Sequence, residues 1–323
     1  MKKVSVIIPT YNRAKYLRQS IESALAQNYG DIEVVVSDNA STDGTSQVIE
    51  DYLGDRRLKY FRNEENIGMV PNWRKALLEY AAGDLAIILD DDDYFIDRHY
   101  IGRAMRLLEK DENIALIHAN TRIFYENKGY YKDTNKKLPE IADGRWMFIN
   151  YKYALKGAVN YDKLTELFNR KMALELNFFS DAILSSDRES FLKMSLMGKV
   201  GFINDVVAVY RIHSGNLFRR RDLCTFFENM RAITNPFEFA KRLGTFNEKE
   251  LERWRKRMIR ESCEIQLIGN MMVLKDRKKF LKEFASRLYH EYPFALTILI
   301  KFLEPRILAK LVIYSFGAIG GRE

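Results

Sequence analysis

The sequence predicts an α/β fold in which a mostly parallel sheet is flanked by helices. Short apolar runs rich in Val and Ile alternate with stretches of helical periodicity through residues 1–112. The first and fourth of these runs, 4–8 and 85–89, are apolar almost throughout, as expected for strands that are covered on both faces. Because helices separate the strands, each connection can return the chain to a parallel neighbour.

Each element of this half has its own signal. Strands are expected at 4–8, 32–37, 58–61 and 85–89, and helices at 14–27, from the cap at 41–43 to about 53, and at 72–82. Apolar residues recur at helical spacing in the first helix. Ser41-Thr42-Asp43 offers N-cap side chains for the second, and Gly83 ends the third.

The second half is less regular. Helices are expected at 98–110 and 187–197, and strands at 114–125 and 200–210. Residues 126–160 show little period, so we expect irregular structure there. Aromatic residues in this segment either form a wall for a sugar acceptor or pack beneath a loop. They are Tyr130, Tyr131, Trp146, Phe148, Tyr151 and Tyr153.

Basic charge is concentrated in the C-terminal third. The net charge is +8, and from His213 onward 22 Lys and Arg face 13 Asp and Glu. Long basic amphipathic helices are expected at 226–242 and 249–274, and these either pack within the protein or contact a membrane surface. The apolar tail, 293–316, is interrupted by charged residues, so a spanning helix is not expected.

The cysteines and the N-terminus indicate the compartment. Cys224 and Cys263 fit neither a metal-binding spacing nor a disulfide framework. The apolar run at the N-terminus stops at Pro9, so it is interpreted as a strand rather than a signal peptide. We therefore expect a cytoplasmic protein, with peripheral attachment at the inner face of the cell membrane as the alternative offered by the basic helices.

Polar loops follow three of the expected strands. Pro9–Arg13 follow the first, Asp38–Gly44 the second and Asp90–Asp93 the fourth. Ligands of such sheets bind beyond the carboxyl ends of the strands, so these loops should converge along one edge. Asp38 either contacts a base or ribose there or serves only as a turn residue.

The four consecutive aspartates, Asp90–Asp93, require compensation of their charge. Neighbouring carboxylates raise one another's pKa unless a cation lies between them. Oxygen ligands favour Mg²⁺ or Mn²⁺, and Mg²⁺ commonly binds carboxylates together with substrate phosphates. The run therefore predicts a cation site for a diphosphate; the alternative is a solvated acidic turn that caps the next helix.

Four segments occur in order along this half of the chain. They are Val-Ser-Val-Ile-Ile-Pro-Thr-Tyr-Asn-Arg, Val-Val-Val-Ser-Asp-Asn-Ala-Ser-Thr-Asp-Gly-Thr, Asn66-Ile-Gly68 followed by Asn72-Trp73, and Ile-Leu-Asp-Asp-Asp-Asp. Together they resemble glycosyltransferase family 2, whose members have the GT-A fold. The resemblance covers residues 1–215 and implies a catalytic domain there, with a donor half at about 1–112, an acceptor half at about 113–215 and a basic helical region at 216–323.

The resemblance implies roles for the matching residues. Pro9, Thr10, Tyr11 and Arg13 would line the nucleotide pocket, and Asp38 would contact the base. Asp90 would lie nearer the ribose or sugar, and Asp92 would bind the metal. Asp91 is counted with the donor-binding residues, but its role and that of Asp93 are less definite. Asn66, also counted with the donor-binding residues, and Gly68 would shape the donor loop.

Two downstream segments complete the resemblance. Tyr210-Arg211-Ile212-His213 is similar to the family's Tyr-Arg-x-His, which implies a metal or diphosphate role for His213. Ser186-Asp187-Arg188-Glu189 is similar to Glu-Asp-x-Glu and implies Asp187 as the catalytic base, although Ser186 and Lys193 depart from the family's usual Glu and Arg. Asp187 is otherwise a helix N-terminal charge, and Asp181 and Glu189 are the alternative bases.

The expected function is that of an inverting, metal-dependent glycosyltransferase. It would move a sugar from a nucleotide-diphosphate sugar, with UDP the family's common nucleotide, to a hydroxyl of a glycan or of an acceptor carried on a lipid diphosphate. The cofactor would be Mn²⁺ or Mg²⁺, and the context bacterial surface polysaccharide synthesis.

Two other classes of function fit the sequence less well. A nucleotide-sugar pyrophosphorylase or other nucleotidyltransferase should carry a glycine-rich basic loop after the first strand, and Pro-Thr-Tyr-Asn-Arg contains no glycine. The alternative of a basic nucleic-acid-binding protein is supported by charge alone, because the sequence contains no nucleic-acid recognition motif. We therefore expect no nucleic acid partner.

Overall fold

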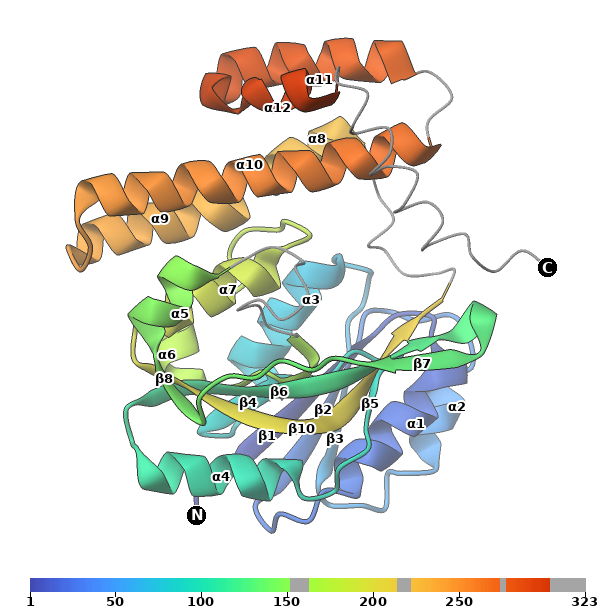
Figure 1. Ribbon diagram of the computed structural model, residues 1–323. Coiled ribbons are helices and arrows are strands. Elements are labelled where there is room, and N and C mark those ends of the chain that lie inside the picture. Colours follow the sequence, from blue (N-terminus) through green and yellow to red (C-terminus); the bar gives the residue numbers. More distant parts are fainter. Residues whose placement is uncertain (152–162, 214–221, 274–276, 303–323) are drawn as a thin grey trace. The chain divides into compact units, whose positions relative to one another are not determined.

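The computed structural model describes residues 1–151, 163–213, 222–273 and 277–302. Two compact units divide the chain, Met1–Leu217 and Phe218–Glu323 (Figure 1). The first unit contains the sheet, and the second is helical. Tyr153 and the tail beyond residue 302 lie outside the described residues.

One sheet organises the first unit, with strand order β3-β2-β1-β4-β9-β6-β10-β5 and with β7 and β8 beside β6 and β10. The longer pairings, β1 with β2 and β4, β2 with β3, and β6 with β10, are parallel. Antiparallel pairings involve the short strands β5, β7, β8 and β9. The mostly parallel sheet is therefore confirmed. Its strands are β1 (Val4–Thr10), β2 (Ile32–Asp38), β3 (Leu58–Arg62), β4 (Leu85–Ile88), β5 (Tyr94–Phe95), β6 (Ile114–Tyr125), β7 (Tyr130–Asp133), β8 (Ile141–Asp143), β9 (Leu167–Asn169) and β10 (Lys199–Ile212).

Helices cover both faces of this sheet (Figure 1). One face carries α1 (Ala14–Leu25), α2 (Thr45–Glu50) and α4 (Tyr100–Lys110), whose apolar side chains share a core with alternate residues of β1 and β2. The other face carries α3 (Met69–Lys75), the π-helical turn η1 (Ala76–Tyr80), α5 (Gly144–Asn150), α6 (Arg170–Glu175) and α7 (Ser186–Ser195). In α1 the buried Leu17, Ile21 and Ala24 fall at the spacing that places them on one side of a helix.

Residues 126–151, the described part of the segment 126–160, are more regular than expected. They contain the short helix η2 (Glu126–Lys128), β7, β8 and α5. Strand β7 returns along the end of β6, and aromatic rings stack across this hairpin, with centroid distances of 4.4 Å for Phe124 and Tyr131 and 4.6 Å for Tyr125 and Tyr130. Every residue of β7 is exposed, so the strand lacks the apolar period that would reveal it in the sequence.

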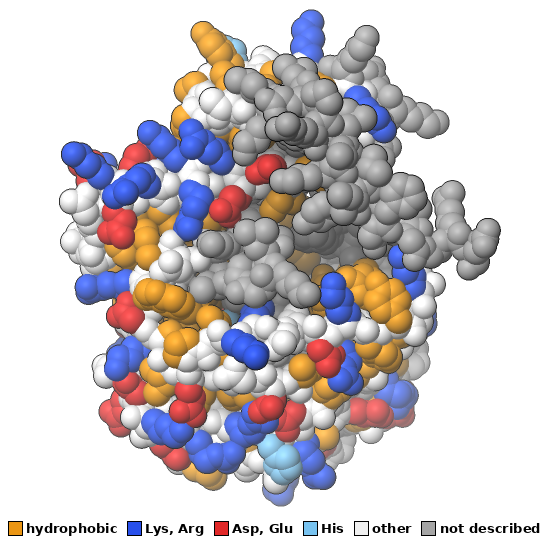
Figure 2. Space-filling view, viewed as in Figure 1, with side chains coloured by type: hydrophobic (Ala, Val, Ile, Leu, Met, Phe, Trp, Pro, Cys, Tyr) orange, Lys and Arg blue, Asp and Glu red, His pale blue; other side chains and the backbone are white. Residues whose placement is uncertain are grey.

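The second unit comprises α8 (Leu223–Glu228), α9 (Arg231–Leu243), α10 (Glu248–Val273), α11 (Arg277–Glu291), the short helix η5 (Pro293–Ala295) and α12 (Thr297–Phe302). The single helix expected at 226–242 is thus two helices, and Asp222 caps the first by accepting the Thr225 N–H. Trp254, Met258 and Phe284 are buried in this unit. Figure 2 shows basic and acidic side chains interspersed over the visible surface. Among the described residues, no helix combines the length and apolarity needed to cross a membrane.

Candidate active site

The ends of β1, β2 and β4 bring the three polar loops to one edge of the sheet. Thr10 pairs with Asp38 at the ends of β1 and β2, and Ile88 at the end of β4 pairs with Ile7. The chain therefore leaves all three strands in the same direction. Loops from sequence positions far apart meet there, as parallel pairing requires.

The loop after β1 is fastened to the loop after β2. Asn12, which has a positive φ of 54°, donates its N–H to Ser41 Oγ and accepts the Thr42 N–H, at 2.9 and 2.7 Å. Asp43 accepts the N–H of Ala14 at 3.0 Å and so caps α1 from the neighbouring loop. Tyr11 in this loop is 43% exposed, whereas Pro9 and Thr10 are buried.

Asp38 is fully buried, and both of its oxygens are occupied by protein groups. Oδ1 accepts the Ser41 N–H at 2.8 Å, and Oδ2 accepts the Tyr60 hydroxyl at 2.8 Å and the Arg62 guanidinium at 3.3 Å. The carboxylate therefore builds the turn after β2. The predicted contact of Asp38 with the nucleotide base stays a prediction. It would require a carboxylate oxygen that already accepts hydrogen bonds from the protein to accept one from the base as well.

Asn66 belongs to a network of amides that shapes the loop before α3. Its Oδ1 accepts from Asn39 Nδ2 at 2.8 Å and from the Gly68 N–H at 2.9 Å. Asn39 in turn accepts from Asn63 Nδ2 and from the Ile67 N–H, each at 3.0 Å. Gly68 has φ of +94°, which side chains rarely tolerate, and α3 begins directly after it. Asn39 lies within the second motif without an assigned role, and Asn63 lies outside the motifs; both are structural members of the site.

The acidic run gathers carboxylates in the geometry of a cation site. Oxygens of Asp90, Asp92 and Asp93 lie within 4.8 Å of one another. Asp91 is also buried; its burial and then the charge of Asp92 raise the pKa of Asp91 to about 8. Such crowding is relieved by a divalent cation with oxygen ligands, so the residues present fit Mn²⁺ or Mg²⁺.

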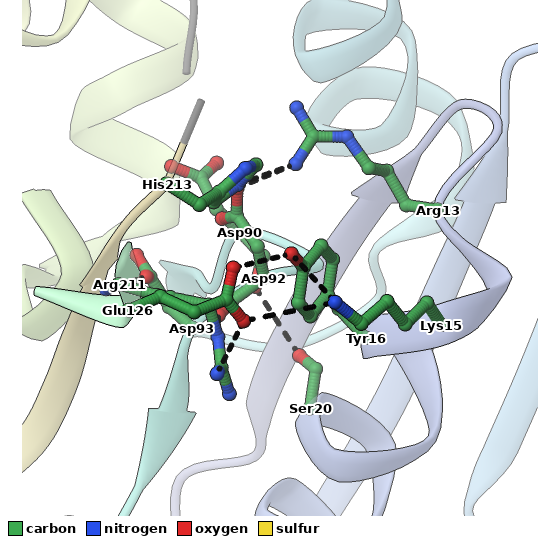
Figure 3. A network of polar contacts seen from close by, with 10 residues as sticks. All are labelled: Arg13, Lys15, Tyr16, Ser20, Asp90, Asp92, Asp93, Glu126, Arg211 and His213. Atoms are coloured by element: carbon green, nitrogen blue, oxygen red, sulfur yellow. Dashed lines mark hydrogen bonds and ion pairs between the residues drawn. The ribbon is translucent and has the colours of Figure 1, made fainter. Parts of the chain in front are cut away.

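Arg13 and His213 meet at Asp92. Nη1 of Arg13 and Nε2 of His213 lie 2.8 and 2.9 Å from Asp92 Oδ2, and 2.8 Å from each other (Figure 3). Arg13 comes from the loop after β1, and His213 directly follows β10. The structure thus brings together four of the expected site residues, Arg13, Asp90, Asp92 and His213.

Arg211 supports the acidic run through hydrogen bonds to Asp92 and Asp93. The sequence motifs did not predict this role. Its N–H donates to Asp93 Oδ1 at 2.8 Å, its Nε to the Asp92 carbonyl at 2.9 Å, and its Nη2 to Gln19 at 2.6 Å. Nη1 lies 3.3 Å from Glu126, and the guanidinium carbon lies 5.0 Å from the ring centre of Tyr16. The signal was present, because Arg211 stands in the Tyr-Arg-x-His segment.

Asp187 lies in the first turn of α7, half-buried. Its charge acts on the same phenol as the acidic run: burial raises the pKa of Tyr210, and Asp93, Asp90, Asp92 and Asp187 raise it further. Glu189, an alternative base, is buried and paired with Lys193. Asp181, the other alternative, is partly exposed ahead of α7. Asp187 and the acidic run therefore share Tyr210 as an electrostatic neighbour.

Comparison with known sequences decides the family. The sequence model described as Glycosyl transferase family 2 matches residues 5–172, just over half of the chain. The chain belongs to glycosyltransferase family 2. The match runs from β1 into α6 and confirms the resemblance drawn from the four motifs.

Relatives of this family 2 glycosyltransferase include two bacterial proteins that are named as sugar transferases. Glycosyltransferase GlyG of Streptococcus pneumoniae is 27% identical over 229 residues, which cover 67% of this chain and 73% of GlyG. The GalNAc(5)-diNAcBac-PP-undecaprenol beta-1,3-glucosyltransferase of Campylobacter jejuni is 36% identical over 145 residues, 42% of this chain and 45% of that protein. The matched region thus spans less than half of the second relative.

Solved structures confirm the GT-A fold. The S. aureus TarS fragment 1–349 in complex with UDP-GlcNAc superposes with a TM-score of 0.67 at 17% identity, over 86% of this chain and 77% of that one. The mannosyltransferase PcManGT of Pyrobaculum calidifontis, in complex with GDP-Man and Mn²⁺, gives 0.55 at 18% identity, over 93% and 85%.

Proposed function

We propose that this family 2 glycosyltransferase moves a sugar from a UDP-sugar to a hydroxyl of a glycan or lipid-linked acceptor, with inversion and with Mn²⁺ or Mg²⁺. The observation that carries the proposal is the cluster of Asp90, Asp92 and Asp93 with His213, set beside the loop after β1. Acidic oxygens and one imidazole suit a cation that also binds phosphate oxygens.

The chemistry follows from the placement of the residues. Asp92 and His213, with Asp90 and Asp93 beside them, would hold the cation, which when bound offsets the charge that develops on the leaving diphosphate. Tyr11 would stack on the base, and Asp91 would contact the donor. Asp187 would accept the proton of the acceptor hydroxyl as that oxygen bonds to the anomeric carbon. The bond to the diphosphate breaks on the opposite face, so the configuration inverts.

The relatives support the choice of donor and acceptor class. TarS has been solved with UDP-GlcNAc, and the name of the Campylobacter relative contains a diphosphate-linked undecaprenol. An acceptor on an anionic carrier suits a chain whose positive charge lies from His213 onward. Contact of the second unit with anionic vesicles belongs to the same proposal. It is tested by flotation with and without residues 293–323, and equal flotation of both forms would remove that segment as the anchor.

A donor hydrolysis and transfer assay with Asp92→Ala tests the proposal. Wild-type protein should release UDP from UDP-sugars only when Mn²⁺ or Mg²⁺ is present, and the variant should lose this activity while keeping its melting temperature within a few degrees. NMR of the product anomer reports inversion. Full metal-dependent activity in the variant, or retention of configuration, contradicts the proposed mechanism.

Nucleotidyl transfer is the second candidate function, because nucleotidyltransferases that make nucleotide-sugars bind ligands similar to those of a glycosyltransferase. The family match and the loop after β1, which lacks a glycine-rich segment, both favour sugar transfer. The same assay separates the two reactions, because a nucleotidyltransferase would release pyrophosphate from a nucleoside triphosphate rather than UDP from a UDP-sugar.

A further inference from the structure

Arg13, Asp92 and His213 form a triangle with nearly equal sides. Nη1 lies 2.8 Å from Asp92 Oδ2 and 2.8 Å from His213 Nε2, and Oδ2 and Nε2 lie 2.9 Å apart (Figure 3). The Asp92 and His213 side chains are only 10% and 6% exposed, and that of Arg13 is 23% exposed. The three polar groups therefore meet where water competes little.

Hydrogen bonds satisfy this triangle poorly. If Nε2 carries no proton, Arg13 donates to two acceptors that subtend about 60° at Nη1, whereas the two N–H bonds of a planar guanidinium nitrogen diverge by about 120°. If Nε2 carries a proton and donates it to Asp92, an imidazole N–H faces the guanidinium N–H at 2.8 Å. Either arrangement leaves one contact bent or repulsive.

A divalent cation at the Nη1 corner would satisfy the same atoms. Two neighbouring ligands of an octahedral ion at about 2.1 Å lie about 3.0 Å apart, and Oδ2 and Nε2 are separated by 2.9 Å. Oxygens of Asp90 and Asp93 lie close to Asp92, within the 4.8 Å span of the acidic cluster. Arg13 Nη1 therefore contacts the two atoms whose spacing suits neighbouring ligands of a metal ion.

We propose that Arg13 is the cation of this site in the donor-free enzyme and that it exchanges with the metal when the nucleotide-sugar binds. The proposal rests on the metal-dependent function proposed above. Displaced from Asp92, the guanidinium would remain on the loop after β1 and pair with the donor diphosphate, an anion whose oxygens match its planar fork.

The exchange makes metal and nucleotide binding depend on each other. Without nucleotide, a metal ion must break the Arg13–Asp92 pair and leave the guanidinium without this partner. With nucleotide present, the diphosphate replaces that partner, so the metal binds more tightly. Arg13 thereby keeps the Asp92 carboxylate compensated in the free enzyme and suppresses metal binding until the donor arrives.

Titration of Mn²⁺, with unbound ion followed by electron paramagnetic resonance, tests this on the full-length protein. Arg13→Gln should bind Mn²⁺ alone about ten- to a hundredfold more tightly than wild type, which is the affinity equivalent of losing a charge-assisted bond that competes with the metal. UDP should strengthen Mn²⁺ binding less in this variant than in wild type. A residue with a merely structural role would weaken Mn²⁺ binding when replaced, so the gain in affinity is diagnostic.

Arg18→Gln is the matched control, because Arg18 is an exposed arginine of α1 that pairs with Asp51 at 2.5 Å. Its Mn²⁺ affinity should equal that of wild type, and thermal unfolding confirms that each variant is folded. If Arg13→Gln binds Mn²⁺ alone no more tightly than wild type while both bind Mn²⁺ with UDP, the exchange is refuted and the metal-dependent function stands. If wild type fails to bind Mn²⁺ even with UDP, the proposed function falls, and the exchange falls with it.

Discussion

Arg211→Lys is the substitution for which the structure makes the most specific forecast. Arg211 is 8% exposed and contacts two residues of the acidic run, Asp92 through its Nε and Asp93 through its backbone N–H. Its remaining nitrogens reach Gln19 and Glu126. Lysine keeps the charge but has one donor nitrogen instead of a planar fork, so it can replace only part of this set.

The magnitude follows from the bonds that lysine cannot make. The backbone bond to Asp93 survives, whereas two of the side-chain bonds, to the Asp92 carbonyl, Gln19 or Glu126, are lost in a buried position. At about 1–1.5 kcal/mol each, these two bonds cost about 2–3 kcal/mol. The lost packing of the guanidinium on the rings of Tyr16 and Phe124 adds to this cost. For a unit of this size that corresponds to a fall in melting temperature of about 5–10 °C.

Thermal unfolding and Mn²⁺ titration with UDP measure the two consequences. The Asp92 main chain loses its support, so Mn²⁺ affinity should also fall, by about tenfold. Arg122→Lys is the control, because Arg122 forks onto Asp133 at 2.6 and 2.9 Å but is 40% exposed, and such pairs contribute less than about 1 kcal/mol. A melting temperature of Arg211→Lys within 2 °C of wild type, or an equal loss in the control, would refute the reasoning.

Three further substitutions address catalysis, the acceptor and stability. Asp187→Asn should lower kcat by about 10²- to 10⁴-fold with UDP affinity unchanged by calorimetry; unchanged turnover moves the base elsewhere. Tyr131→Ala, at an exposed ring of the β6–β7 hairpin, should raise the acceptor KM about three- to tenfold and spare donor hydrolysis, whereas Tyr289→Ala in α11 should change neither. Glu33→Gln should destabilise by about 1–2 kcal/mol at pH 7, because bonds from Lys3 and Ser5 hold the pKa of Glu33 below its ordinary value although burial alone would raise it. Since a lowered pKa contributes stability that is complete above the unfolded-state pKa and lost as pH falls through the folded-state pKa, this difference from wild type should shrink in acid; a larger difference at pH 3–4 would contradict it.

The donor half of the fold could be predicted because its strands are buried on both faces. β1, β2 and β4 are buried along their whole length and rich in Val and Ile, and a parallel pairing of such strands leaves little choice about where the following loops meet. The placement of Pro9–Arg13 beside Asp90–Asp93 followed from that pairing alone. Here one local pattern determined both the strands and the edge at which the site lies.

The acceptor half could not be predicted in the same way, because its elements are short or exposed. β7 is exposed along its whole length, and β9 has only three residues, so neither carries a readable period. The contact of Arg13 with His213 joins residues 200 positions apart and depends on the register of β10 against β6, which local patterns do not encode. Arg13 and His213 could each be predicted as site residues from the motifs, but their direct contact could not.

Burial and bonding partners separate the motif residues that build the site from those that face its ligand. Asp38 and Asn66 belong to the family motifs, yet the first is fully buried with both oxygens bonded, and the second is bonded to Asn39 and Gly68. Tyr11 comes from a neighbouring motif and is 43% exposed. Two residues that both belong to family motifs can therefore differ in role: one builds the loop, and the other faces the ligand. Replacing Asp38 removes bonds that hold the turn after β2, so the protein's stability should change before its affinity, whereas replacing Tyr11 removes only surface that a ligand can cover.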